Sequence, residues 1–469
     1  MFYLNFTIRN TLFISIFANK NGNIIMDTIF KRKIYSEMLD WKMESAGESA
    51  LLIEGPRRVG KSTIVKQFAR NEYRSHIIID FAKASSEEKG LFNDISDLDY
   101  FFTRLKLLKG VSLYERESVI VFDEVQQFPV ARQAIKYLVE DGRYDYIETG
   151  SLISIHKNVD NIVIPSEEEA ISMFPMDYEE FRWALGDNDT ITLLREMLEK
   201  KKPLGDDVNR RMLRDFRLYM LVGGMPQAVD KYIETLDLMK VDKVKRGIIR
   251  IYEQDFHKLD KSDKAKAIFK AIPSELYKNA TRYQMTTVVG KMNGDSVRGL
   301  VEMIEDSRTV NIAYHSNDPN VGMELTSDKS SYKMYICDTG LFVTLAFWDK
   351  KFTENIIYQK LLNDKLDANL GYVYENAVAQ ALASSGNKLF YYTWLDANNH
   401  AYEVDFLLSR GPKLWPLEVK SAGYNTHKSL DEFCKKFSGR ISNRFLVYTK
   451  DLRKDHDTIM IPIYMVGLL

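Results

Sequence analysis

The chain has 469 residues, of which 45% are hydrophobic and 28% are charged, and its formal net charge is -1. These values are typical of a globular protein of about three domains, and they exclude a uniformly basic protein that coats nucleic acid. Two cysteines far apart in sequence, Cys337 and Cys434, exclude a disulfide framework and a cysteine metal cluster. No stretch reaches the roughly 18 apolar residues of a spanning helix, so we expect a cytoplasmic protein without membrane contact.

The first 25 residues differ in character from the rest of the chain. Met26 opens a segment that reads as a natural start. We expect residues 1–25 to be an over-extended gene start or a loose tail, and the alternative is a short additional strand.

A glycine-rich octapeptide lies between the apolar run 50–53 and a helical stretch over residues 63–69. It reads Gly55-Pro56-Arg57-Arg58-Val59-Gly60-Lys61-Ser62 and matches the pattern G-x-x-x-x-G-K-[ST]. Glycines let such a loop curl so that its N–H groups face phosphates, with the positive end of the next helix behind them. We expect residues from Gly55 to Thr63 to bind ATP, with Lys61 on the β and γ phosphates and Ser62 on Mg²⁺. The alternative is an ordinary glycine-rich turn.

Four more apolar runs follow, over residues 76–81, 119–122, 146–149 and 171–174. Their spacing predicts strands that alternate with helices in a buried parallel sheet. The second run ends in Asp123-Glu124, as in the Walker B element of P-loop ATPases, where the aspartate holds Mg²⁺ and the glutamate polarises the attacking water. The alternative is a pair of carboxylates that caps the next helix. After the third run we expect Ser151 to sense the γ phosphate, unless Thr149-Gly150-Ser151 is a simple turn.

Helical signals dominate from Tyr178 to about Asp260. An arginine among residues 210–217 is either a γ-phosphate sensor or part of a solvated basic face. Three helical patterns (265–277, 286–292 and 295–308) and two strand-like runs (309–314 and 332–337) then predict a winged helix. The acidic balance of the third helix favours a packing module over a reader of base sequence.

Two alternating runs near the C-terminus, 402–408 and 414–420, flank a turn at 409–413. Alternation along a strand places Glu418 and Lys420 on one face, with Asp405 opposite them. This is the arrangement of PD-(D/E)XK phosphodiesterases, whose carboxylates hold a divalent metal while the lysine acts on the attacking water. Glu375, on a helix from Gly371, is a further candidate metal ligand. The alternatives are a solvated, salt-bridged strand face and a related fold that binds without cutting.

Nearly the whole chain after Met26 resembles a family of prokaryotic AAA-type ATPases, in which a P-loop domain precedes a shared C-terminal region of uncertain role. The resemblance rests on the octapeptide and on the segments Phe122 to Gln126, Thr149 to Ser151, Phe174 to Phe181, Gly223 to Pro226 and Lys333 to Leu341. It implies an α/β fold: a P-loop NTPase parallel sheet with a helical lid, then a winged helix and a small α/β nuclease-like domain.

The boundaries expected for these parts are 1–25 for the extension, 26–182 for the ATPase core, 183–262 for the lid, 263–350 for the winged helix and 351–469 for the nuclease-like domain. The expected activity is Mg²⁺-dependent ATP hydrolysis with Glu124 as the base. Its output is either a metal-dependent nuclease (Glu375, Asp405, Glu418 and Lys420) acting on DNA or RNA, or a nucleotide-switched platform for a protein partner. The sequence leaves homo-oligomer formation open.

Overall fold

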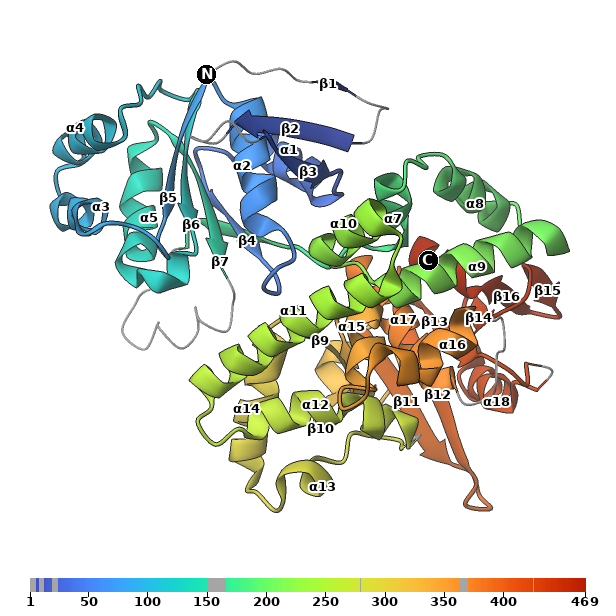
Figure 1. Ribbon diagram of the computed structural model, residues 1–469. Coiled ribbons are helices and arrows are strands. Elements are labelled where there is room, and N and C mark those ends of the chain that lie inside the picture. The colour runs from blue at the N-terminus through green and yellow to red at the C-terminus, as the bar shows by residue number, and fades with distance from the viewer. Residues whose placement is uncertain are drawn as a thin grey trace. The chain divides into compact units, whose positions relative to one another are not determined.

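The computed structural model describes residues 6–7, 12–18, 24–150, 166–278, 280–362, 370–424 and 426–469. Side chains are described for these residues from Ile29 onward, except for Leu362. The chain divides into two compact units (Figure 1). The N-terminal unit comprises Met1–Phe174 with Asp306–Arg308, and the C-terminal unit comprises Pro175–Glu305 with Thr309–Leu469. The expected end of the ATPase core at residue 182 therefore lies inside the C-terminal unit.

The centre of the N-terminal unit is a five-stranded sheet in the order β5-β6-β7-β4-β8, in which every pair is parallel. Its strands are β4 (Ala50–Glu54), β5 (Ser75–Asp80), β6 (Ser118–Asp123), β7 (Asp145–Gly150) and β8 (Glu168–Ser172). All residues of β6 and β7 are buried, as the near-continuous apolar runs predicted.

Helices cover both faces of this sheet because neighbouring side chains on a strand point to opposite sides. Leu51 and Ile53 of β4 belong to one core cluster, whereas Leu52 belongs to another. The first cluster contains residues of α1 (Ile34–Glu44) and α2 (Lys61–Glu72), and the second contains residues of α4 (Leu98–Lys109) and α5 (Pro129–Asp141). A short helix, α3 (Ser86–Gly90), precedes α4. The predicted α/β class is confirmed.

A separate three-stranded sheet lies near the N-terminus. It consists of β1 (Phe6–Thr7), β2 (Leu12–Ala18) and β3 (Ile24–Phe30), paired antiparallel in that order. The described residues within this stretch, 6–7, 12–18 and 24–25, therefore lie in strands, which is closer to the alternative of a short additional strand than to a loose tail.

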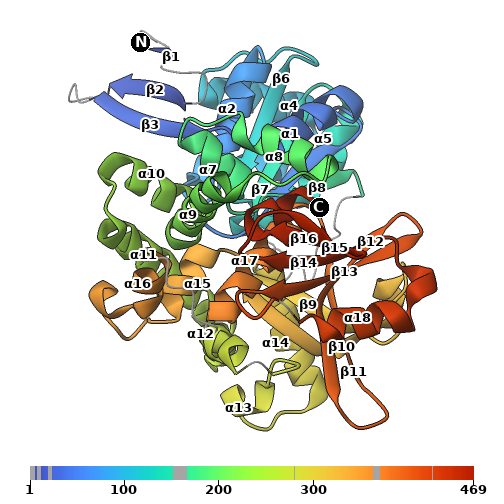
Figure 2. The same ribbon diagram turned by 90° about the vertical axis from the view of Figure 1, so that its right-hand side faces the viewer.

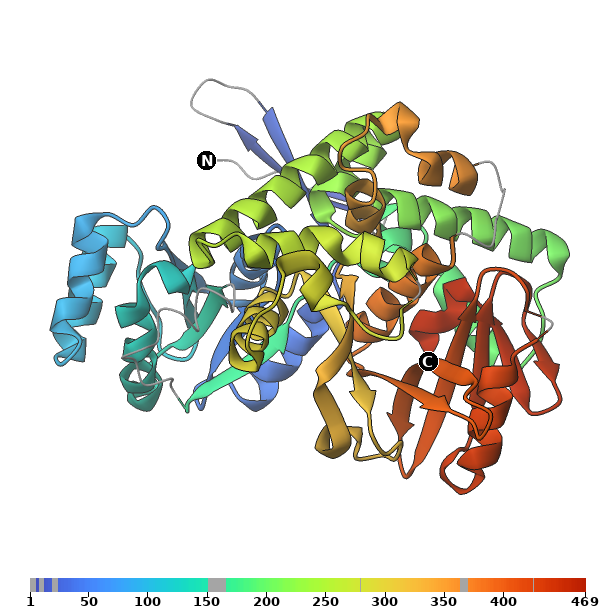
Figure 3. The ribbon, with the colours of Figure 1, turned by 90° about the horizontal axis from the view of Figure 1, so that it is seen from below.

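The C-terminal unit is built on an eight-stranded mixed sheet in the order β10-β9-β11-β12-β13-β14-β16-β15 (Figures 2 and 3). Its strands are β9 (Val310–Ser316), β10 (Ser327–Ile336), β11 (Leu389–Leu395), β12 (Ala401–Arg410), β13 (Lys413–Lys420), β14 (Arg444–Tyr448), β15 (Arg453–Asp455) and β16 (Thr458–Pro462). β13, β14 and β16 run parallel to one another.

The helices of the C-terminal unit fall into two sequence groups, before and after the β9–β10 hairpin. The first group is α7 (Tyr178–Ala184), α8 (Thr190–Glu199), α9 (Asp206–Val222), α10 (Pro226–Thr235), α11 (Leu238–Leu259), α12 (Lys264–Tyr277), α13 (Met285–Val289) and α14 (Gly294–Asp306). The second is α15 (Thr339–Leu345), α16 (Ile356–Leu362), α17 (Gly371–Ser384) and α18 (Lys428–Lys436). Across the described residues, none of the helices is long and apolar enough to cross a membrane.

The three helices and the hairpin of the expected winged helix are present, but the hairpin is not a separate module. Strand β9 pairs in parallel with β11, so the hairpin continues the C-terminal sheet, and the expected boundary at residue 350 lies within one compact unit. The hairpin was predicted from local pattern, whereas its pairing with β11 joins residues far apart in sequence.

The helices expected to form a lid over the ATPase core belong to the C-terminal unit instead. The fully buried ammonium of Lys245, on α11, donates hydrogen bonds to the carbonyl oxygens of Leu221 and Gly340 and to the hydroxyl of Tyr358. Because a buried charge requires such partners, this contact ties α11 to both α9 and α15.

Two segments that carried the family resemblance meet in this unit. The buried carboxylate of Asp338 accepts hydrogen bonds from the backbone N–H groups of Gly224 and Leu341. A Cβ on Gly224 would lie 2.0 Å from the carbonyl oxygen of Met176, and one on Gly340 would lie 2.6 Å from the Cα of Gly223. At the turn Gly223-Gly224-Met225-Pro226 the backbone therefore packs so closely against other backbone that only glycine fits.

Candidate nucleotide site and carboxylate cluster

The P-loop connects the carboxyl end of β4 to the start of α2, where open α/β sheets bind ligands. Gly55 has φ 151°, and a Cβ there would lie 2.3 Å from the carbonyl oxygen of Met173. Gly60 has φ 105° and immediately precedes α2. Both positions require glycine. The loop between them leads into the N-terminus of α2, where backbone N–H groups favour an anion.

Lys61 is 7% exposed, and its ammonium donates to the carbonyl oxygens of Gly55 at 2.8 Å and Pro56 at 3.0 Å. Burial lowers the pKa of Lys61 to about 8, although the nearby carboxylates of Glu124 and Asp123 act in the opposite direction. A desolvated ammonium with only carbonyl partners gains free energy when a phosphate reaches it.

Asp123, at the end of β6 and 2% exposed, joins the P-loop to the neighbouring strand β7. Its Oδ1 accepts hydrogen bonds from Ser62 Oγ at 2.7 Å and from Thr149 Oγ1 at 2.6 Å, and Lys66 Nζ lies 3.5 Å from Oδ2. The structure thus brings together the serine and aspartate that the sequence predicted on separate segments.

Glu124 follows in the left-handed region with φ 57°, which turns the chain sharply away from β6. Its N–H donates to Thr149 Oγ1 at 3.1 Å, and its carboxylate accepts from Gln126 Nε2 at 2.6 Å. Thr149 is thus a residue of the site to which the sequence analysis gave no role. Its polar side chain near the end of a central strand is the feature that could have indicated one. The predicted sensor Ser151 lies outside the described residues.

Arg32 is a second unassigned residue, and it precedes the octapeptide by more than twenty positions. It is 7% exposed and donates to the carbonyl oxygens of Val59, at 3.0 Å, and Phe174, at 2.6 Å. Nothing in the local sequence marks this role. The neighbouring loop residues Arg57 and Arg58 are exposed, whereas Val59 is buried in the core.

The oxygen atoms of Ser62 and Asp123 fit a magnesium site. Mg²⁺ is usually bound by one or two protein oxygens together with substrate phosphates, and the hydroxyl and carboxylate here are already within hydrogen-bond distance of each other. Thr63 directly follows them on α2, where its N–H is bonded to the carbonyl oxygen of Gly60.

In the C-terminal unit the predicted hairpin is present, with Arg410 of β12 opposite Lys413 of β13. Asp405 accepts a hydrogen bond from the N–H of Val419 at 2.7 Å. Glu418 accepts from the N–H of Leu430 at 3.2 Å and pairs with Lys420 at 2.8 Å. The predicted residues therefore lie together, but two of their carboxylates are occupied by backbone donors.

A buried lysine that was given no role in the sequence analysis lies among these carboxylates. Lys333, on β10, is 5% exposed, and its Nζ is 3.1 Å from Glu375 Oε1 and 2.5 Å from Glu403 Oε1. Tyr335 also donates to Glu375 at 2.6 Å. Burial alone disfavours the ammonium, but Glu375 and Glu403 together raise the pKa of Lys333 above its ordinary value.

This arrangement does not fit a divalent metal. The charge that a metal would supply is provided by the ammonium of Lys333, and burial together with the charge of Glu375 raises the pKa of Asp405 well above its usual range. In the described part of the chain, no three His, Cys, Asp or Glu side chains are placed to hold a metal ion. The ligand roles of Glu375, Asp405 and Glu418 stay predictions, and these contacts argue against them.

The parallel sheet, the P-loop and the Ser62–Asp123 contact define an AAA-type P-loop ATPase domain. Residues 47–182 match the model of a family described as an AAA domain. Residues 213–351 and 370–466 match two families described as domains of unknown function, DUF8612 and DUF4143. No curated protein matches the chain.

The solved structures to which the chain is similar include a DNA replication initiation factor, 9% identical, with 59% of this chain and 88% of that chain covered and a TM-score of 0.24. Another is a Signal Transduction ATPase with Numerous Domains (STAND) protein with a tetratricopeptide repeat sensor from Pyrococcus horikoshii. It is 11% identical, with 76% of this chain and 49% of that chain covered and a TM-score of 0.26. At these values neither likeness informs the activity of this chain.

Proposed function

We propose that this protein is a Mg²⁺-dependent ATPase whose nucleotide state controls a C-terminal unit that binds a partner without cutting it. The observation that carries the ATPase part is the network in which Asp123 Oδ1 accepts from both Ser62 and Thr149. It holds the end of β6 against the start of α2, where the phosphates of ATP would lie.

Within this proposal each residue of the nucleotide site has one task. Lys61 would leave its two carbonyl partners for the β and γ phosphates, and Ser62 and Asp123 would hold the metal, which would neutralise phosphate charge. Glu124 is the base that orients the attacking water. Gln126 donates to one oxygen of this carboxylate, which orients it and leaves its second oxygen to accept a proton from the water.

Steady-state phosphate release by wild type and by Glu124→Gln tests the assignment of the base. We expect a fall in kcat of at least about a hundredfold with little change in the KM for ATP. Glu140→Gln, an exposed glutamate on α5 of the same unit, is the matched control and should retain wild-type turnover. Equal turnover by wild type and Glu124→Gln would show that Glu124 is not the base.

The route proposed for coupling starts at Arg32. Its guanidinium bridges the P-loop, through the carbonyl oxygen of Val59, to Phe174, which is the last residue of the N-terminal unit before Pro175. A change of the loop on ATP binding is thereby passed to the segment that leads into the C-terminal unit. We expect ATP to change the rate of limited proteolysis near residue 175 in wild type but not in Arg32→Met, and an unchanged ATP response in Arg32→Met would refute this route.

The non-cutting role of the C-terminal unit is supported by the Lys333 ion pairs with Glu375 and Glu403. The competing proposal is a metal-dependent nuclease that acts on DNA or RNA through Asp405, Glu418 and Lys420. Incubation of plasmid DNA and single-stranded RNA with the full chain and Mn²⁺ separates the two. We expect no cleavage, whereas degradation that is abolished by Asp405→Ala would establish the nuclease.

A further inference from the structure

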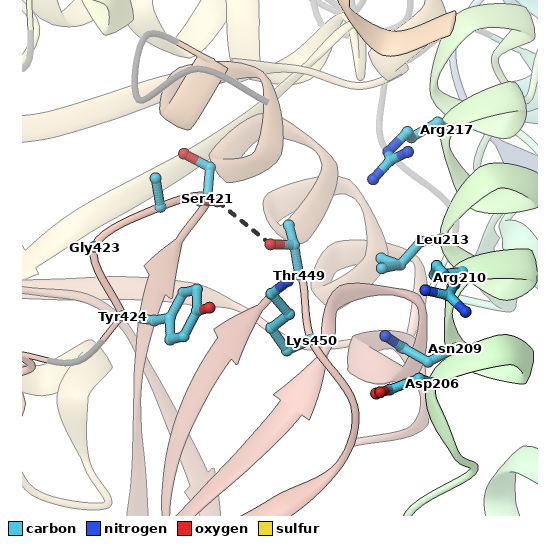
Figure 4. Close-up of a pocket in the computed structure, with 11 residues that line it drawn as sticks. Asp206, Asn209, Arg210, Leu213, Arg217, Ser421, Gly423, Tyr424, Thr449 and Lys450 are labelled. Carbon is cyan, nitrogen blue, oxygen red and sulfur yellow. Dashed lines mark hydrogen bonds between the residues drawn. The ribbon is translucent and has the colours of Figure 1, made fainter. Parts of the chain in front are cut away.

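A cavity of about 500 Å³ opens in the C-terminal unit (Figure 4), and none of Glu375, Glu403, Asp405 and Glu418 lines it. One wall is α9, which presents Asp206, Asn209, Leu213 and other residues at helical spacing. The opposite wall is formed by the segments that follow β13 and β14, from Ser421 and from Thr449. The volume is that of a pocket for a small ligand.

The position of this cavity in the sheet is one at which ligands bind. β13 and β14 are parallel neighbours, and the segments that line the cavity begin where these two strands end. In open α/β sheets the crevice beyond the carboxyl ends of parallel strands is the usual ligand site. The α9 wall is held to the strand side by Asp451, because its carboxylate accepts hydrogen bonds from the N–H groups of Leu204 and Gly205, just before α9.

The charged side chains that line the cavity are mainly cationic. Arg210, Arg217 and Lys450 line it, against the single carboxylate of Asp206. Arg217 is 6% exposed and lies close to the phenol of Tyr374. Burial of this phenol raises its pKa, and the positive charge of Arg217 acts against that rise. Figure 4 shows Arg217 and Arg210 on the α9 wall and Lys450 on the strand side, so the positive charges come from both walls.

We infer that this cavity is a binding site for a small phosphorylated ligand, which it recognises through a phosphomonoester or diphosphate group. Guanidinium groups bind phosphate oxygens in pairs, and the hydroxyl of Ser421 supplies a neutral donor on the opposite wall. The partly exposed ring of Tyr424 closes one side and offers an apolar surface to the rest of the ligand. The site is separate from the P-loop, and nothing in it depends on ATP hydrolysis.

Calorimetric titration of the full chain with inorganic pyrophosphate tests this site. The Lys61→Ala background is used throughout, so that the P-loop does not contribute to the signal. The double variant Arg210→Met/Lys450→Met removes two exposed charges from the cavity without disturbing the buried Arg217. The matched control is Arg214→Met, on the same helix, because its side chain is 76% exposed and does not line the cavity.

We expect pyrophosphate to bind the background protein and the dissociation constant to rise at least about tenfold in the double variant, with less than a twofold change in the control. Absence of binding to the background protein, or equal losses in the double variant and the control, would overturn the proposal. A second arm compares a trinucleotide with and without a 5′ phosphate. Equal affinity for the two would also overturn it, because a phosphomonoester would then not be what the cavity recognises.

Discussion

The ammonium of Lys333 lies 3.1 Å from the carboxylate of Glu375, and it joins a strand of the β9–β10 hairpin to helix α17 across the C-terminal unit. The same ammonium pairs with Glu403 on β12, so one buried cation holds three elements together. Glu375, a predicted metal ligand, is therefore paired with a buried lysine in the folded chain.

Replacement of Lys333 by methionine leaves Glu375 and Glu403 without their buried partner. We expect a loss of about 3 to 5 kcal/mol in the free energy of unfolding, measured by urea denaturation. Lys329→Met, an exposed lysine on the same strand, should cost less than about 0.5 kcal/mol. Adding Glu403→Gln to Lys333→Met should restore part of the loss, and equal stability of the Lys333 and Lys329 variants would contradict the role given to Lys333.

ATP binding should depend on pH through Lys61. Burial lowers the pKa of this lysine in the free protein to about 8, and contact with phosphates favours its charged form and raises the pKa in the complex. Below pH 8 the lysine is already charged, so affinity is flat there, and above pH 8 each binding event must take up a proton. We expect the dissociation constant for ATP to rise with pH above about 8, with a slope of up to tenfold per pH unit.

Calorimetry in two buffers of different ionisation enthalpy measures this proton uptake directly. Uptake should be near zero at pH 7 and approach one proton per ATP near pH 9. Binding without proton uptake at pH 9 would mean that Lys61 remains charged in the free protein.

Thr149→Val keeps the shape of the side chain but removes the hydroxyl that donates to Asp123 and accepts from the N–H of Glu124. We expect kcat for ATP hydrolysis to fall about tenfold with a small change in KM, because the loss of one such contact misplaces Asp123 and Glu124 together. Thr103→Val, exposed on α4, is the control and should be unchanged. A wild-type kcat in Thr149→Val would remove this residue from the site.

Two glycines of the C-terminal unit should respond to alanine with opposite signs. A Cβ on Gly224 would lie 2.0 Å from the carbonyl oxygen of Met176, whereas no heavy atom lies within 4 Å of one on Gly247, inside α11. We expect Gly224→Ala to destabilise the protein by about 3 kcal/mol and Gly247→Ala to stabilise it by up to about 1 kcal/mol. Thermal unfolding of both variants measures the difference, and a neutral Gly224→Ala would show that the turn can move away from Met176.

Local sequence pattern was enough to predict the main strands and the phosphate-binding loop of the N-terminal unit. Strands β4 to β7 follow from apolar runs of the right length, and the octapeptide specifies its own loop because glycines at 55 and 60 permit conformations that other residues do not. Even the β12–β13 hairpin and α17 are local enough to be predicted. In each case the residues that define the element are neighbours in sequence.

Only the tertiary structure decided what surrounds those elements. Lys333 meets Glu375 and Glu403, and Arg32 meets Val59 and Phe174, across separations that no periodicity encodes. Likewise, the β9–β10 hairpin, predicted as the wing of a winged helix, is part of the C-terminal sheet because β9 pairs with β11. Ion pairing and strand pairing over long separations depend on which surfaces the whole chain buries together, and this is why neither the partners of Lys333 nor the pairing of β9 with β11 could be predicted from local pattern.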